Sequence, residues 1–265
     1  MKLFLLALCI STAYSLNNVE NPVDISSASK FLQEIDPFNE VAPHSFPFTV
    51  MIQIHQNNVW VNNCAGVILR SNRVLTTAQC LRNATAVTVI AGVHNRDRVE
   101  PNQQRRNVPA SSFNIHPHYD NNRLNNVAIL NVATPFTLNT VVAQAILPNS
   151  VDEETFEGQT ARTLSWARIS GETLSSSVLR SLTNTVISNT ECERFFVPGF
   201  VFHSTICVAS STQNRNFCGT SVLTAERGGS IVIGLSDFVP PGCEVGRPFG
   251  FVRLSSFVTW INSQL

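Results

Sequence analysis

The chain lacks an excess of charge of either sign, and it has almost no lysine. Its 265 residues carry 18 Lys and Arg against 18 Asp and Glu, and lysine occurs only at Lys2 and Lys30. Proteins that bind the phosphates of nucleic acids usually have a basic surface. We therefore expect no nucleic-acid partner. The hydrophobic fraction of 43% and the charged fraction of 14% are ordinary for a globular protein. The length fits either one large β-type domain or two small ones that share a core.

The chain also lacks an apolar run of the roughly 20 residues that a membrane-spanning helix needs. The apolar run at the N-terminus, residues 3–10, is much shorter, and it follows Lys2 and precedes small residues at Ala13 and Ser15. This order predicts a cleaved signal peptide over residues 1–15. We expect a secreted, extracellular protein without a membrane partner.

No Cys-x-x-Cys pair occurs, although the sequence has 7 cysteines. Zinc ligands usually lie about two to four residues apart, so a metal site is the less favoured interpretation, and we expect no metal or other cofactor. Cys9 lies within the signal peptide. The remaining six predict three disulfides, for which the sequence alone permits 15 pairings; they are Cys64, Cys80, Cys192, Cys207, Cys218 and Cys243.

Short β-branched and aromatic runs, broken by Asn, Gly and Pro, predict an all-β sandwich or barrel. One series occupies residues 47–138 and a second occupies residues 160–254. The tail differs, because a serine at position 255 or 256 can cap a helix. The apolar face of that short C-terminal helix would carry Phe257, Trp260 and Ile261.

Residues 74–80, with the sequence VLTTAQC, are the most informative segment. They resemble the Val-Leu-Thr-Ala-Ala-His-Cys block of chymotrypsin- and trypsin-like serine proteases, with Gln79 in place of the catalytic histidine. The resemblance extends over residues 35–265 and is closest to the invertebrate three-disulfide type. The other blocks that carry it are residues 43–48, 64–69, 125–130, 163–167 and 218–260.

This resemblance implies a fold of two perpendicular antiparallel six-stranded β-barrels with the active site between them. The domain would span residues 35–265, behind an N-terminal extension of residues 16–34 that remains from a pro-segment. The resemblance also implies a disulfide pairing, namely Cys64 with Cys80, Cys192 with Cys207, and Cys218 with Cys243.

The positions that match the catalytic residues of the family hold other side chains. The Gln79 carboxamide has no accessible protonation change and cannot act as a general base. Asn126 stands where active relatives carry the aspartate that orients the histidine. Counting from Cys218 without a gap places Val222 at the nucleophile position, whereas a one-residue deletion places Ser221 there. We therefore expect no catalytic residue and predict an inactive homologue that is not an enzyme.

The specificity pocket is expected to be filled. Asn216 would form its base and Asp237 would line its wall, while the bulky Val239 and Phe249 would exclude a substrate side chain. The usual activation is also expected to be missing. Residues 35–38 read Ile-Asp-Pro-Phe after a glutamate, whereas active members begin Ile-Val-Gly-Gly after a basic residue.

Two surface signals are weaker. The sequon that begins at Asn83 predicts an N-linked glycan in a secreted protein, and an unmodified asparagine is the alternative. Four arginines could bind sulfated glycans or an acidic partner, or could simply belong to a solvated loop; they are Arg96, Arg98, Arg105 and Arg106.

The sequence thus predicts a secreted serine protease homologue that acts by binding proteins, in protease-cascade regulation, innate immunity or inhibitor capture. Its expected partners are proteases, protease inhibitors or immune factors, with sulfated glycans as a further class. One alternative is a serine-type endopeptidase with an atypical site built on Ser221. A third interpretation is an abundant secreted protein with a structural or nutrient role.

Overall fold

The structure is a computed structural model, and it describes residues 39–120, 122–149, 155–211, 215–226 and 230–265. The expected signal peptide, the N-terminal extension and the altered activation sequence at residues 35–38 lie outside the described residues.

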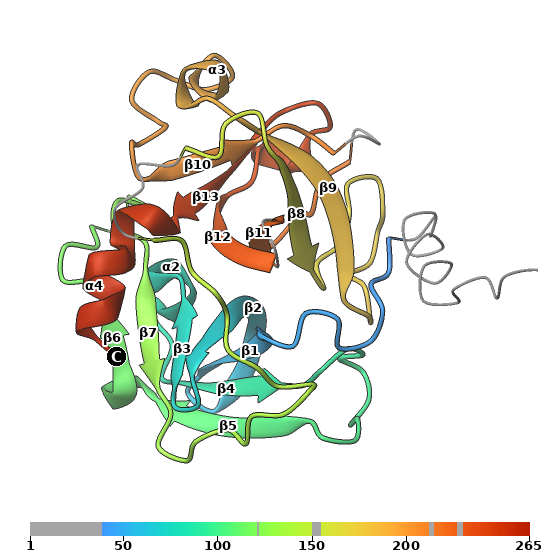
Figure 1. Cartoon of the computed structure of the whole chain (residues 1–265), viewed down its shortest axis with the longest axis vertical. Coiled ribbons are helices and arrows are strands. Elements are labelled where there is room, and N and C mark those ends of the chain that lie inside the picture. The colour runs from blue at the N-terminus through green and yellow to red at the C-terminus, as the bar shows by residue number, and fades with distance from the viewer. Residues whose placement is uncertain (1–38, 121, 150–154, 212–214, 227–229) are drawn as a thin grey trace, which may run out of the picture.

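Within the described residues, seven strands form a first antiparallel sheet in the order β5-β4-β1-β2-β3-β7-β6 (Figure 1, lower half). β5 and β6 lie at opposite edges of this sheet, yet only the 3-10 turn η1 (Ala110–Ser112) joins them, so the sheet must curl until its edges approach. The strands are β1 (Thr49–Gln56), β2 (Val59–Arg70), β3 (Arg73–Thr76), β4 (Ala86–Ala91), β5 (Gln104–Pro109), β6 (Phe113–Ile115) and β7 (Ala128–Asn131).

A second set of strands forms a closed barrel in the order β10-β13-β12-β11-β8-β9 (Figure 1, upper half). These strands are β8 (Thr160–Ser165), β9 (Arg180–Ile187), β10 (Thr205–Val208), β11 (Val222–Glu226), β12 (Ser230–Phe238) and β13 (Phe249–Arg253). The helical elements are short: α2 (Ala78–Leu81), α3 (Asn189–Glu193), η2 (Pro241–Cys243), η3 (Leu254–Phe257) and α4 (Val258–Ser263).

The all-β architecture of two barrel-like sheets with a C-terminal helix is confirmed, but the expected strand number needs a correction. The first sheet has seven strands in the described chain instead of six. β5 and β6 are separate strands because Pro109 ends β5 and precedes the η1 turn. Proline has no N–H with which to continue the hydrogen bonding of the strand.

Strand alternation explains why the core has separate parts. In β1, Val50, Ile52 and Ile54 point into the first barrel, while Met51 points to an apolar cluster shared with the second barrel. A further cluster, with Phe249 and Phe251, fills the second barrel. The two barrels therefore meet across packed side chains, and the groove described below lies where that packing ends.

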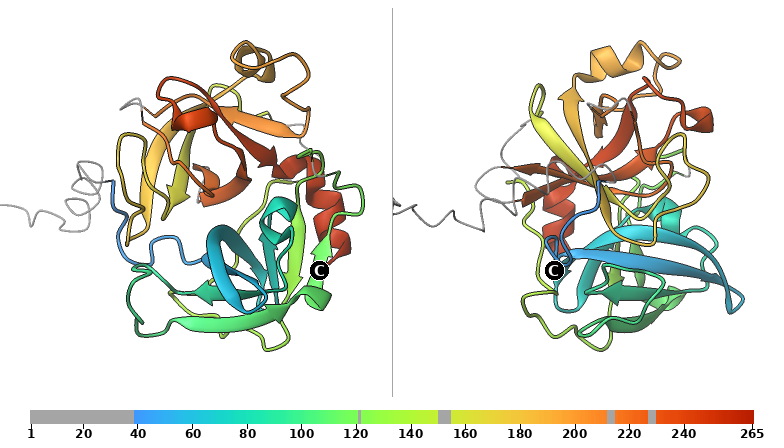
Figure 2. Two further views of the ribbon diagram at one scale, coloured as in Figure 1. Left: turned by 180° about the vertical axis from the view of Figure 1, so that it is seen from behind. Right: turned by 90° about the vertical axis from the view of Figure 1, so that its right-hand side faces the viewer.

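The C-terminal helix α4 leaves the second barrel and packs on the first, as both views in Figure 2 show. Ile261 is fully buried, and the ring of His116 lies 5.0 Å from that of Trp260. The expected serine cap is wrong. The helix begins at Val258 without a side-chain cap, because β13 passes directly into η3, which contains both serines.

The six cysteines form three disulfides with the pairing that the family resemblance implies. The Cys64–Cys80 bridge joins β2 to α2, and Cys192–Cys207 joins α3 to β10. Cys218–Cys243 connects the segment before β11 to η2. Two of these bridges hold the segments that border the groove.

Arg180, at the start of β9, holds the preceding loop through a two-pronged ion pair. Its Nη1 and Nη2 donate to Oε2 and Oε1 of Glu172 at 2.8 and 3.0 Å. Burial opposes ionisation of Glu172, but hydrogen bonds from Arg180 and from the Ile169 N–H outweigh it, so the pKa of Glu172 is lowered.

Replacing Glu172 by Gln should therefore lower the free energy of unfolding by about 1–3 kcal/mol at neutral pH. A lowered pKa supplies stability above the ordinary carboxyl pKa, and this stability is lost as the pH falls through the pKa of the folded state. Urea denaturation of both proteins should show the difference shrinking between about pH 7 and about pH 3. A difference that is constant across this range would contradict the account.

Candidate functional site

A groove with two lobes lies between the two barrels. The larger lobe, of about 560 Å³, is bordered by β2, α2 and the end of β12. The smaller lobe, of about 340 Å³, is bordered by β2 and Trp166. Both volumes are typical of ligand sites. The residues that line both lobes are Val61, Asn62, Cys64, Gly219 and Thr220, so the two lobes are continuous.

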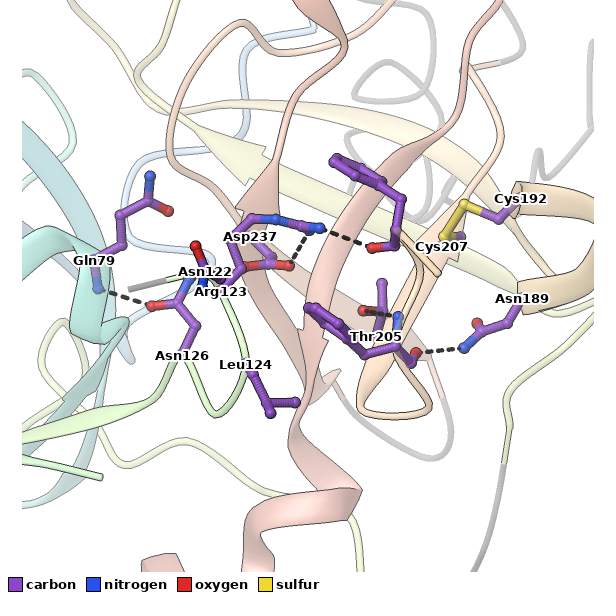
Figure 3. A network of polar contacts seen from close by, with 12 residues as sticks. Gln79, Asn122, Arg123, Leu124, Asn126, Asn189, Cys192, Thr205, Cys207 and Asp237 are labelled. Atoms are coloured by element: carbon purple, nitrogen blue, oxygen red, sulfur yellow. Dashed lines mark hydrogen bonds and ion pairs between the residues drawn. A yellow bond between two sulfur atoms is a disulfide. The ribbon is translucent and has the colours of Figure 1, made fainter. Parts of the chain in front are cut away.

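Gln79 and Asn126 lie together at one side of the larger lobe. Gln79 lines the lobe from α2, and Asn126 is buried with 1% of its surface exposed. Asn126 Oδ1 accepts a hydrogen bond of 2.8 Å from the backbone N–H of Gln79, whose side chain extends away from Asn126 (Figure 3). Neither carboxamide titrates near neutral pH, so this pair supplies hydrogen bonds without exchanging a proton.

A buried carboxylate from the other barrel completes this pair. Asp237, near the end of β12, accepts a hydrogen bond of 2.8 Å from Asn126 Nδ2. Its other oxygen pairs with Arg123 Nη1 at 2.9 Å, and its side chain is only 3% exposed. Burial raises the pKa of Asp237, although the bonds from Asn126 and Arg123 oppose the rise. The negative charge of this site thus lies on the second barrel.

Arg123 reaches across from a loop of the first barrel and is surrounded by aromatic rings (Figure 3). Its guanidinium carbon lies 4.0 Å from the ring centre of Phe200 and 4.8 Å from that of Phe238. Its Nη2 donates to the carbonyl of Phe200 at 2.7 Å. Ion pair, cation–π contacts and hydrogen bond together make Arg123 a link between the two barrels.

Our sequence reasoning missed Arg123, although a signal for it existed. Asp237 interrupts the apolar run of β12, and a carboxylate in such a strand needs a compensating partner. The sequence offers no way to choose that partner among 18 basic residues, because Arg123 is 114 positions away.

Neither of the two candidate nucleophile residues, Ser221 and Val222, lines the groove. Val222 is the first residue of β11, is fully buried, and pairs with Leu164 and Leu235. Ser221 is 4% exposed, and its N–H donates to Ser236 Oγ. Instead, Gly219 and Thr220 line the groove. Neither register proposed from the sequence therefore brings Ser221 or Val222 to the groove, because β11 begins too soon after Cys218.

The four expected pocket residues do not line one pocket. Asn216 and Phe249 border a separate small cavity of about 10 Å³, which is about the room that one water needs. Asn216 donates through Nδ2 to Ser210 Oγ and the Arg247 carbonyl, and its Oδ1 has no partner among the described residues. Asp237 and Val239 line the larger lobe of the groove instead.

The sequon at Asn83 and the four surface arginines lie in different surroundings. Asn83 is exposed at the rim of the larger lobe, and its glycan remains a prediction. Arg106 donates to the Thr134 and Pro135 carbonyls, so its donors are used inside the fold. Of the four arginines, Arg96 lines the groove.

The described residues contain neither a cluster of metal-binding side chains nor a membrane-spanning helix. No three His, Cys, Asp or Glu side chains in that part of the chain lie close enough together to hold a metal ion. No helix there combines the length and apolar character needed to cross a membrane.

Comparison with known proteins places this geometry in a family. Residues 35–261 match the family model described as Trypsin. The chain belongs to the trypsin family. It is 27% identical over 270 residues to chymotrypsin of Phaedon cochleariae, covering 96% of this chain and 93% of that one. It is also 27% identical over 271 residues to collagenase of Hypoderma lineatum, covering 98% and 95%. The solved structure of HL collagenase has a TM-score of 0.74 at 24% identity, covers 86% and 97%, and supports the fold.

The prediction that this trypsin-family chain is not an enzyme is overturned by these comparisons. The relatives are named chymotrypsin and collagenase, which are proteases, so the family is enzymatic. The substitutions at Gln79 and Asn126 belong to this chain, but they do not by themselves move it out of an enzyme family.

Removing the Arg123 charge should expose the cost of the buried carboxylate. Arg123→Met should lower the free energy of unfolding by about 3–5 kcal/mol at neutral pH, because Asp237 is left buried without its ion pair. Without Arg123 the pKa of Asp237 rises further, so that Asp237 takes up a proton as the pH falls. The loss of unfolding free energy in the variant should therefore be smaller at about pH 5 than at about pH 7. The control is Arg123→Met combined with Asp237→Asn, which should recover part of the loss. A loss that is equal at both pH values, with no recovery, would show that the charge pair is unimportant.

Burial also predicts how Ser221 responds to a serine-directed reagent. We expect no covalent fluorophosphonate adduct on Ser221, because its side chain is inside the second barrel and a hydroxyl without an adjacent base is a poor nucleophile. Peptide mass mapping, with Ser221→Ala as the matched control, checks this. An adduct at Ser221 that disappears in Ser221→Ala would support the atypical peptidase site.

Proposed function

We propose that this member of the trypsin family is secreted and acts by binding proteins in the groove between its two barrels. The observation that carries the proposal is the contrast between two spaces. The groove has lobes of about 560 and 340 Å³, whereas the cavity beside Asn216, of about 10 Å³, has room for no more than about one water. A ligand therefore lies along the groove as an extended chain, without inserting a large side chain beside Asn216.

Backbone groups at the junction of the two lobes support this mode of binding. The N–H groups of Gly219 and Thr220 have no acceptor in the described part of the chain. Backbone donors that border a groove can bond the carbonyls of an extended ligand. Gly219 also needs to be glycine, because a Cβ there would lie 2.8 Å from Cβ of Ala167.

An apolar edge supports the choice of a protein ligand. Val59, Trp60 and Val61 at the start of β2 are 62%, 58% and 48% exposed. The indole N–H of Trp60 donates to the Asn62 carbonyl at 2.9 Å, which fixes the ring beside the groove. Contiguous exposed apolar side chains with a fixed aromatic ring are typical of protein interfaces.

The partners that we propose are proteases, protease inhibitors or immune factors, because a groove on a protease scaffold matches the surface that protease inhibitors recognise. A role in regulating a protease cascade, in innate immunity or in inhibitor capture is part of the same proposal. Secretion is supported by the signal-peptide pattern and by three disulfides, which persist in oxidising compartments.

The test blocks the groove without touching the core. Val61→Arg and Thr220→Trp each place a large side chain where the lobes meet, and Val99→Arg is the matched control because Val99 is 83% exposed outside the groove. Binding to a panel of purified protease inhibitors is measured by surface plasmon resonance. Each blocking variant should weaken binding at least about tenfold, while the control binds as the wild type does. Unchanged binding by both blocking variants would contradict the proposal.

A further inference from the structure

The charge that lines the groove is not balanced, although the chain as a whole is neutral. Three arginines and one aspartate line the two lobes: Arg82, Arg96, Arg123 and Asp237. Arg123 and Asp237 neutralise one another at 2.9 Å. The groove therefore keeps the positive charges of Arg82, in its larger lobe, and Arg96, in its smaller lobe.

These two arginines are available to a ligand. Arg82 is exposed, and its guanidinium makes no ion pair or hydrogen bond within the described residues. In the part of the chain that the structure describes, the one ion pair of Arg96 is a long contact of 3.7 Å to Asp97. The side chains of Arg96 and Asp97 are 25% and 63% exposed. A long ion pair with a mostly exposed partner is worth little and competes weakly with a ligand. Asp120, in the loop that carries Arg123, does not line either lobe, and its Oδ1 accepts hydrogen bonds from the Asn122 and Leu124 N–H groups.

Neutral donors and an apolar contact lie between the two charges. Gly219 and Thr220 line the junction of the lobes, and their N–H groups lack acceptors in the described residues. Val61 faces the same junction from β2, and Trp60 lines the lobe that contains Arg96. A ligand that satisfies all of these groups carries acceptors along its length, negative charge toward both ends, and an apolar side chain between them.

We propose that the ligand of this groove is an extended acidic polypeptide segment. Its carboxylates pair with Arg82 and Arg96, its backbone carbonyls accept from Gly219 and Thr220, and an apolar side chain packs on Trp60 and Val61. This inference rests on the proposed function, since it names the chemistry of the protein that binds. A polypeptide fits better than a sulfated glycan because an exposed Trp–Val edge offers a glycan no charge to pair with.

The experiment compares ligands that differ in charge alone. Fluorescein-labelled decapeptides with Leu at the centre carry four Glu, four Gln or four Lys, and a sulfated heparin oligosaccharide is the fourth probe. Fluorescence anisotropy measures binding to the full chain at low and high salt. The variants are Arg82→Glu and Arg96→Glu, and Arg105→Glu is the matched control because Arg105 is exposed on β5 outside the groove. Since the relatives are proteases, mass spectrometry after each measurement checks that the peptide is intact.

The Glu peptide should bind at least about tenfold more tightly than the Gln peptide, and the Lys peptide should bind most weakly. High salt should weaken binding of the Glu peptide. Arg82→Glu and Arg96→Glu should each lower its affinity about tenfold or more, whereas Arg105→Glu should leave the affinity unchanged. Equal binding of Glu and Gln peptides, both lost in Val61→Arg, would overturn the acidic ligand and leave the proposed function standing. Preferential binding of the oligosaccharide, lost in Arg82→Glu, would also overturn it. If no peptide binds and Val61→Arg is without effect on inhibitor binding, both proposals are wrong.

Discussion

Asp237 lies on β12 of the second barrel with its carboxylate almost fully buried, and the arginine that compensates it comes from a loop of the first. Burying a carboxylate is costly unless it is paired and hydrogen-bonded. Here Arg123 and Asn126, both from the opposite barrel, each donate one hydrogen bond to Asp237. The Phe200 carbonyl accepts a further bond from Arg123 and fixes its guanidinium. The position of one barrel relative to the other is therefore coupled to this network. Arg123 and Asp237 of this network also line the larger lobe of the groove.

This network changes how the groove can be used. Arg123 occupies the aromatic surface formed by Phe200 and Phe238, so that surface is already filled by a side chain of the protein itself. The pair also removes one positive and one negative charge from the groove. What remains open to a ligand is the path along β2 and past Gly219 and Thr220, with arginines in both lobes. The interaction that stabilises the interface between the barrels thus also limits the proposed binding to this path.

The fold could be predicted from the sequence because its signals are local. Strand patterns, cysteine spacing and blocks such as residues 74–80 each depend on a few neighbouring residues, and the structure confirms the all-β fold and the three disulfides. The site was harder to predict because it depends on contacts distant in sequence. Counting from Cys218 could not reveal that β11 starts at Val222, since strand pairing with Leu164 and Leu235 decides that point. The sequence placed Asp237 in the wall of a pocket, and it lines the larger lobe, but its ion pair with Arg123 depends on a residue 114 positions away.

We propose that a polypeptide binds in the groove at the junction of its two lobes. Amide hydrogen exchange of the full chain, with and without a saturating acidic peptide, tests it most directly, because exchange reports which backbone N–H groups a ligand covers. The account predicts slower exchange at Gly219 and Thr220 and along residues 59–63 of β2, with little change in β5 (Gln104–Pro109). Slower exchange confined to β5, with the amides of Gly219 and Thr220 unaffected, would contradict it.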